Sequence, residues 1–181
     1  MELNQIITGC QKNDRSCQKQ LYDLYYAYGM KVASMYSNNF EDASEVVNDA
    51  FFDVFKQIEN YDFNQSFIPW FRVILIRKAI NHYHKNIKYY NLEKSLELYD
   101  SIDIPEITLL SEIDATELLS FVNQLTPAYR MVLNLYAIEG YSHKEIAKML
   151  TISTGTSKSN LSKARNFLKK WMSELKIFSL I

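Results

Sequence analysis

The amino-acid sequence predicts an all-α protein made of two small helical domains joined by an acidic linker. Only four glycines and three prolines occur in 181 residues, so few residues interrupt a helix. Apolar residues recur at spacings of three and four, which is typical of helices packed on one side. Runs of alternating apolar and polar residues, which would indicate strands, are scarce. With 48% hydrophobic and 14% aromatic residues, the chain can fill a core.

The first long helix is expected from about Asp14 to Ser37, and the second from about Glu41 to Ile58. The first carries an apolar stripe at helical spacing, formed by Leu21, Leu24, Tyr25, Tyr28, Val32 and Met35. In the second, the acidic side chains lie largely off the apolar stripe. By itself, an acidic helix face of this kind indicates a solvated surface.

A third helix is expected to start around Ile68, because Pro69 is tolerated in a first helical turn. It ends in the basic tract 84–88. Aromatic and basic residues on one helix suit stacking and phosphate contact with unpaired DNA. Core packing is the competing interpretation of its aromatic residues Trp70 and Phe71.

Charge divides the chain into blocks, although the net charge is only −1. Residues 67–91 contain no acidic residue, and residues 151–181 contain six basic residues against Glu174 alone. The acidic residues of the other segments repel the negatively charged phosphates of DNA, so the intact chain should bind naked DNA poorly.

The predicted organisation is a first domain at residues 1–90, the acidic linker at residues 91–110, and a second domain at residues 111–175. A helix from about Ile107 to Gln124 is expected to lead into the second domain.

Start and stop signals define short helices in the second domain. Thr126, followed by proline, is a hydroxyl cap. Gly140 fits the left-handed residue that closes a helix. Ser142 and Glu145 match a capping box, and the next helix ends at the break 151–153. A short helix, a tight turn and a longer basic helix make a helix-turn-helix.

The outward face of the last helix carries polar and basic side chains that can reach phosphates and base edges in a major groove. The candidate duplex-binding residues are Thr156, Lys158, Ser159, Asn160, Ser162, Lys163 and Arg165. The competing interpretation is a solvated helix in a small bundle.

At these positions the sequence resembles region four of the extracytoplasmic-function sigma factors, which are initiation subunits of bacterial RNA polymerase. The matching residues are Leu125, Pro127, Arg130, Glu139, Gly140, Ser142, Glu145, Ile146, Ala147, Leu150, Gly155, Thr156, Lys158, Ser159, Leu161, Ala164 and Arg165. The resemblance implies that the last helix reads the minus-thirty-five promoter element. Three residues depart from the family pattern: Thr151 replaces a glycine, Ser157 a valine and Asn160 an arginine.

The resemblance extends to the first domain, through the motif D-A-x-x-V-V-x-D-x-F at 42–51 and the run 67–83. It implies contacts with core polymerase by Asp42, Glu45, Asn48 and Asp49. It also implies capture of unpaired minus-ten bases by Asn64, Gln65, Ser66, Trp70, Arg77, Lys78, Asn81 and Lys85. Asn48, Arg77, Asn81 and His84 depart from the family pattern, so no base preference is predicted.

The resulting hypothesis is a sigma factor that directs core RNA polymerase to promoters and assists promoter melting. Core polymerase and promoter DNA are the expected partners, and the family also implies an anti-sigma factor, which no residue demonstrates. Two alternatives remain open. One is a stand-alone helix-turn-helix regulator, and the other is a polymerase-binding decoy that does not read promoters.

The sequence offers no plausible nucleophile–base pair, phosphate loop or metal-ligand spacing, so we expect no enzyme, cofactor, metal or small-molecule substrate. Cys10 and Cys17 are expected to be reduced thiols. No signal peptide or bilayer-spanning apolar run is apparent, and the expected location is the cytoplasm.

Overall fold

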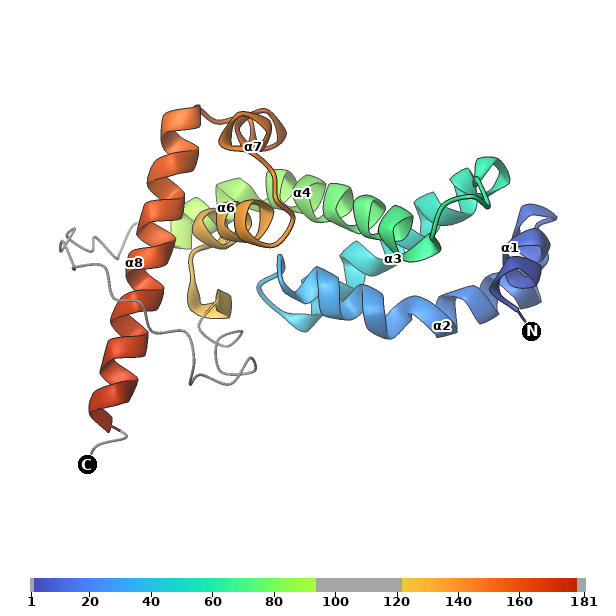
Figure 1. Cartoon of the computed structure of the whole chain (residues 1–181), viewed down its shortest axis with the longest axis horizontal. Helices are drawn as coiled ribbons and strands as arrows, with labels where there is room; N and C mark the ends of the chain where they lie inside the picture. Colours follow the sequence, from blue (N-terminus) through green and yellow to red (C-terminus); the bar gives the residue numbers. More distant parts are fainter. Residues whose placement is uncertain (1, 94–121, 179–181) are drawn as a thin grey trace. The chain divides into compact units, whose positions relative to one another are not determined.

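The computed structural model describes residues 2–93 and 122–178. The chain divides into two compact units, Met1–Tyr83 and His84–Ile181. Figure 1 shows that the described residues form helices joined by short connections, without a strand. The all-α fold class predicted from the sequence is therefore confirmed. Most of the predicted linker 91–110 and of the helix predicted at 107–124 lies outside the described residues, and the predicted domain boundaries stay a prediction.

The first unit contains four helices and a 3-10 turn. They are α1 (Leu3–Gln11), α2 (Arg15–Ser34), α3 (Phe40–Gln57), η1 (Ile58–Asn60) and α4 (Phe67–Glu93), whose last turns belong to the second unit. The sequence predicted α2, α3 and α4 but missed α1. Asp14 is the N-cap of α2, because its side chain accepts hydrogen bonds from the backbone N–H groups of Ser16 and Cys17. Asn13, at φ 59°, completes the turn from α1 into α2.

Aromatic rings form the centre of the first unit. Phe71 of α4 is fully buried, and its ring centroid lies 4.8 Å from that of Phe51 of α3. Tyr25 of α2 packs on Phe67 at 4.6 Å. Gly29 permits a close approach in this core, since a Cβ there would lie 3.3 Å from Val47. Phe71 is thus a core residue, as the competing interpretation of the sequence proposed.

The second unit is a helix-turn-helix built on α6 (Pro127–Ala137), α7 (His143–Leu150) and α8 (Thr154–Phe178). Leu135, Ile146 and Ala164 place one fully buried side chain from each helix in its core. The predicted start signals are present: Thr126 caps α6, and Ser142 and Glu145 form the capping box of α7. Gly140 has the left-handed conformation expected of it, at φ 76°.

Thr151 closes α7 in the left-handed region, at φ 55° and ψ 44°. A β-branched residue is strained there, where the family pattern has glycine. The departure from glycine at this position therefore leaves a strained turn between α7 and α8. None of the described helices is both long enough and apolar enough to cross a membrane.

Candidate nucleic-acid and polymerase interfaces

The start of α8 is fixed by its own side chains. The backbone N–H of Thr156 donates to the Ser153 hydroxyl at 2.9 Å, and the two hydroxyl groups are also 2.9 Å apart. This arrangement satisfies one backbone donor that the first turn of a helix would leave without a partner. The first turn of the proposed recognition helix is therefore held in place before any DNA binds.

The predicted duplex-binding residues lie on the solvent side of α8. All of them except Asn160 are exposed, and Asn160 is half-buried. Leu161 and Ala164 are buried on the opposite side, against the rest of the unit. Because three or four residues make one turn, this pattern presents a continuous polar and basic face to solvent.

A polar and aromatic network links this face to α6 and α7. The Oγ atom of Ser157 lies 2.9 Å from Nδ1 of His143, the first residue of α7. The His143 ring stacks on Tyr136 of α6, with centroids 4.7 Å apart and an interplanar angle of 22°. The Arg165 guanidinium lies 5.7 Å from the centroid of the same tyrosine. This network could not be predicted from the sequence, in which Ser157 is only a departure from the family's valine.

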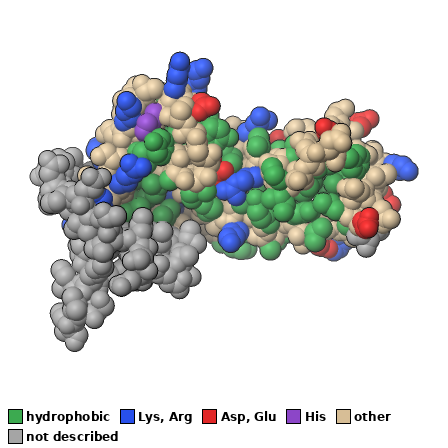
Figure 2. All heavy atoms as spheres, in the orientation of Figure 1, with side chains coloured by type: hydrophobic (Ala, Val, Ile, Leu, Met, Phe, Trp, Pro, Cys, Tyr) green, Lys and Arg blue, Asp and Glu red, His purple; other side chains and the backbone are tan. Residues whose placement is uncertain are grey.

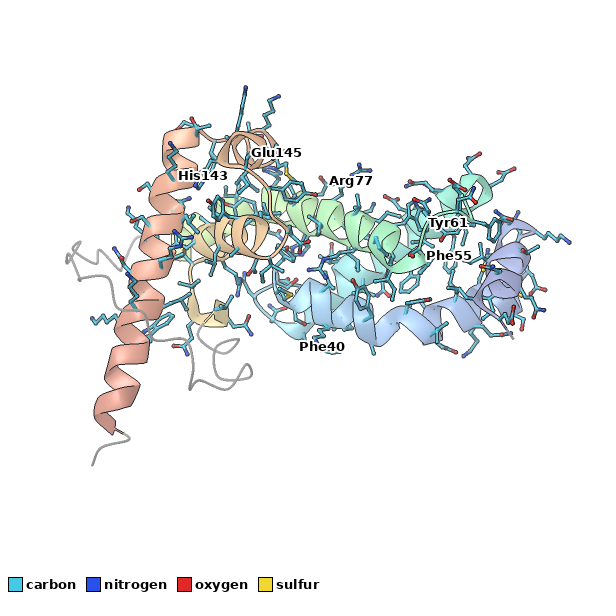
Figure 3. All side chains as sticks on the ribbon, in the orientation of Figure 1. Phe40, Phe55, Tyr61, Arg77, His143 and Glu145 are labelled. Carbon is cyan, nitrogen blue, oxygen red and sulfur yellow. The ribbon has the colours of Figure 1, made fainter. Side chains whose placement is uncertain are left out.

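The residues around His143 and Glu145 shift the pKa values of both side chains. Its pKa is lowered from the ordinary value, first by desolvation and then by the positive charges of Lys158 and Arg165. The pKa of Glu145 is lowered because its carboxylate accepts hydrogen bonds from the backbone N–H and hydroxyl of Ser142. His143 and Glu145 come from the same end of α7 (Figure 3).

In the first unit, the loop before α4 carries the first three predicted minus-ten residues. Asn64, Gln65 and Ser66 are all exposed. Two hydrogen bonds within the loop fix its conformation. The Tyr61 hydroxyl donates to the Gln65 carbonyl at 2.6 Å, and the Asn64 N–H donates to the Asp62 carboxylate at 2.9 Å. The polar side chains are thus displayed on a loop with a defined course.

The other predicted minus-ten residues lie along α4. Trp70 is half-buried and meets Tyr61 edge-on, with centroids 5.0 Å apart. Arg77 and Asn81 are exposed and four residues apart, so they share a helix face, and Figure 3 shows Arg77 projecting on the side of α4 away from α2. Lys78 instead pairs with Asp53 of α3 at 2.8 Å. Lys85 is also exposed, on the turns of α4 that belong to the second unit.

The four predicted polymerase-binding residues all lie on α3 but have different surroundings. Asp42 and Glu45 face the buried His82 of α4, with carboxylate oxygens 3.6 and 3.7 Å from Nε2. Asn48 accepts a hydrogen bond from the Tyr22 hydroxyl at 3.0 Å. Asp49 is exposed. The acidic face is therefore tied to α2 and α4 at three of its positions.

The sequence could not reveal the position of His82. In the sequence, His82 stands on the predicted third helix with no acidic residue within 67–91. The two acids that meet His82 are nearly forty residues away in the chain, so the pairing depends on how α3 packs against α4.

Large apolar side chains also remain at the surface of the first unit. Leu24, Phe40 and Phe52 are 56%, 66% and 59% exposed. The Lys56 ammonium lies 4.1 Å from the Phe52 ring centroid. Figure 2 shows hydrophobic surface over α2 and α4, whereas lysine and arginine side chains stand out over α7 and the start of α8. The apolar surface of the first unit fits a protein partner better than duplex DNA.

Within residues 2–93 and 122–178, no group of three or more histidine, cysteine, aspartate or glutamate side chains could hold a metal ion. Cys10 and Cys17 are free thiols and both are buried. Burial is the main reason that the pKa of Cys10 is raised to about 11, with smaller contributions from Cys17 and Asp14.

Comparisons with known proteins give two family matches and several similar proteins. The family "Sigma-70 region 2" matches residues 21–88, and the family "Sigma-70, region 4" matches residues 115–168. The chain is 24% identical to the ECF RNA polymerase sigma factor SigW of Bacillus subtilis, over 97% of this chain and 99% of that protein. It is 27% identical to the ECF RNA polymerase sigma-E factor of Escherichia coli K12, over 88% of each.

Among solved structures, the chain is similar to the sigma factor RpoE in complex with the anti-sigma factor NepR from Bartonella quintana. The identity is 20%, the match covers 86% of this chain and 96% of that chain, and the TM-score is 0.49.

Proposed function

Since the chain belongs to the sigma-70 family, as an extracytoplasmic-function sigma factor of RNA polymerase, we propose that its two helical units divide promoter recognition between them. The first unit binds core polymerase and captures unpaired minus-ten bases. The second reads the minus-thirty-five element in duplex DNA. The work is done by binding rather than by catalysis, and it takes place where core polymerase is, in the cytoplasm.

The observation that carries the assignment of the second unit is the exposed face of α8. Lys158, Lys163 and Arg165 supply charges for phosphates, and Thr156, Ser159 and Ser162 supply hydroxyl groups, all exposed on one helix. Hydroxyl groups and cations are the side-chain types that contact backbone and base edges in a major groove. The cap at Ser153 and the contact of Arg165 with Tyr136 set the direction of this face.

For the minus-ten element, we infer that the 62–66 loop and the exposed face of α4 act together. Unstacking a base costs a few kcal/mol, and contacts to the flipped base must offset that cost. A pre-shaped loop with exposed Asn64, Gln65 and Ser66 offers amide and hydroxyl groups for such contacts. Arg77 and Asn81 extend the polar surface along α4, and Trp70 supplies a partly exposed ring for stacking. Promoter melting is assisted by this capture.

For core polymerase, we infer that α3 provides the docking face. Asp49 is exposed, and Asp42, Glu45 and Asn48 flank it on the same helix. The exposed Phe52 lies three residues after Asp49 and therefore on a neighbouring part of the same helix surface, so charge and apolar surface are adjacent. A basic partner with an apolar component suits such a face. An anti-sigma factor is a further partner that the family implies, and no residue of this chain identifies one.

The experiment that tests this function is run-off transcription by core polymerase on a library of randomised promoters, with and without the chain. Start sites that need the chain and share two spaced elements are expected. If none appear although the chain co-purifies with core polymerase, the chain is a decoy. A stand-alone regulator is favoured by a different result: no such start sites appear, the chain does not bind core polymerase, and it binds an operator by itself.

A further inference from the structure

We propose that His143 is a proton-linked contact to the DNA backbone: its Nε2 binds a phosphate while Ser157 holds Nδ1 and Tyr136 holds the ring face. The inference rests on the proposed binding of duplex DNA by α8. It adds a residue of α7 to that surface and makes the contact respond to pH.

The first observation is a buried serine in the recognition helix. Ser157 is fully buried, and its hydroxyl lies 2.9 Å from His143 Nδ1. A buried hydroxyl needs a hydrogen-bond partner, and a valine, which the family pattern has here, could not supply one to the imidazole. A hydroxyl can also donate or accept. Ser157 can therefore donate to Nδ1 of a neutral His143 and accept from Nδ1–H of a charged one.

The second observation is the orientation of the ring. With Nδ1 directed at Ser157, the other nitrogen, Nε2, lies on the far edge of the ring. It carries a proton in the charged ring, and it carries the proton of the neutral ring when the Ser157 hydroxyl donates to Nδ1. Tyr136 covers one face by stacking. His143 is half-buried, and Figure 2 shows a histidine at the surface among lysine and arginine side chains, where Figure 3 places His143. Nε2–H is thus a donor at the edge of the basic surface.

The third observation is the charge around His143. Lys158 and Arg165 of α8 lie close enough to disfavour its protonation, α6 contributes the neutral Tyr136, and the nearest carboxylate of α7, Glu145, is engaged by Ser142. A DNA phosphate that pairs with the two cations cancels this repulsion and attracts a third positive charge. DNA binding therefore favours the charged imidazole.

The consequence is that binding duplex DNA takes up a proton. The affinity should rise as the pH falls from about 8 to about 6, which spans the range where histidine titrates. One proton can change affinity by at most about tenfold per pH unit. Because the free imidazole is partly solvated, we expect about a three- to fivefold gain over this range.

The test is the affinity of the full chain for a labelled mixed-sequence DNA duplex, measured by fluorescence anisotropy at low and constant ionic strength across this pH range. Wild type should show the gain. His143→Gln keeps an N–H donor but cannot titrate, so its affinity should be nearly constant with pH. As a matched control, Lys163→Gln should weaken binding at every pH because a cation is lost, and it should keep the wild-type slope.

A second measurement observes the imidazole directly. The titration of His143, followed by the NMR shift of its ring protons and assigned with the Gln variant, should move to higher pH when the duplex is added. If wild type and His143→Gln bind with the same pH slope, the inference is wrong although α8 still binds DNA. If wild type does not bind the naked duplex, the series is repeated with the chain assembled on core polymerase and a promoter duplex from the randomised library, because the acidic segments of the free chain oppose DNA binding. Absence of duplex binding there as well would refute duplex binding by the second unit, and this inference with it.

Discussion

Aromatic rings dominate the core of the first unit, whereas the second unit has an aliphatic core and a side-chain cap at the start of each of α6, α7 and α8. Phe71, Phe51 and Phe67 join the helices of the first unit through ring contacts. In the second unit, side-chain hydrogen bonds fix the starts of α6, α7 and α8, as at Thr126 and Ser142. The difference matches the proposed partners. A large apolar core can support exposed apolar residues for a protein partner, whereas helices fixed at their ends can aim a face at DNA.

The largest effect is expected from removing a ring of the first unit. Phe71→Ala should lower the free energy of unfolding by about 3–5 kcal/mol, because a fully buried aromatic side chain leaves a cavity. Phe52→Ala is the matched control: Phe52 is 59% exposed, so its loss should have little effect on stability. Urea unfolding of the two variants measures both. Equal destabilisation by the two changes would show that the first unit is not organised around Phe71.

A cap of the second unit should have a smaller effect. Ser142→Ala removes the hydroxyl that accepts from the Glu145 N–H, and we expect a loss of about 1 kcal/mol. Ser159→Ala is the control, since this exposed serine lies within α8 and caps nothing in the structure. Urea unfolding followed by helix signal compares the two. The importance of caps would be refuted by identical unfolding midpoints.

Relief of strain should give a gain of less than about 1 kcal/mol. Thr151→Gly removes a β-branched side chain from the left-handed region but adds flexibility to the unfolded chain. Asn13→Gly, in the first unit, should gain less, because asparagine tolerates this conformation better. Thermal unfolding of the two variants ranks them. A loss of stability in Thr151→Gly would mean that the threonine makes a favourable contact that outweighs its strain.

The smallest effect near neutral pH concerns the Cys10 thiol. Its pKa is raised to about 11 in the folded chain, so folding favours the protonated thiol. This contribution is fully present below the ordinary thiol pKa of 9.0 and is lost as the pH rises toward 11. Cys10→Ala should therefore reduce the alkaline decline in the urea midpoint and leave its neutral-pH dependence unchanged. If the alkaline decline of the urea midpoint were the same in Cys10→Ala, ionisation of the buried tyrosines would be its cause instead.

Much of the fold could be predicted because its signals are local. The capping box at Ser142 and Glu145 and the glycine at 140 each depend on neighbours within four residues. The stripes of α2 and α3 also gave the right elements. Helix α1 was missed because it is only nine residues long and has only three buried residues, Ile6, Ile7 and Cys10. Its burial comes from packing against α2 and η1, which the sequence alone does not reveal.

The candidate sites were less predictable, because their contacts join distant parts of the chain. The sequence identified the polar face of α8 but could not place His143 against Ser157 and Tyr136. In the same way, Lys78 was predicted to meet DNA, and its pairing with Asp53 of α3 depends on packing. Which residues contact polymerase and promoter stays a prediction.

The proposal that the first unit binds core polymerase and the second reads duplex DNA is tested most directly by one charge reversal in each unit. For Asp49→Lys and Lys158→Glu, co-purification with core polymerase and initiation at a promoter obtained from the randomised library would be measured together. We expect Asp49→Lys to lose polymerase binding, and Lys158→Glu to keep it but lose initiation at that promoter. If Lys158→Glu lost polymerase binding while Asp49→Lys retained it, the assignment of the two units would be contradicted.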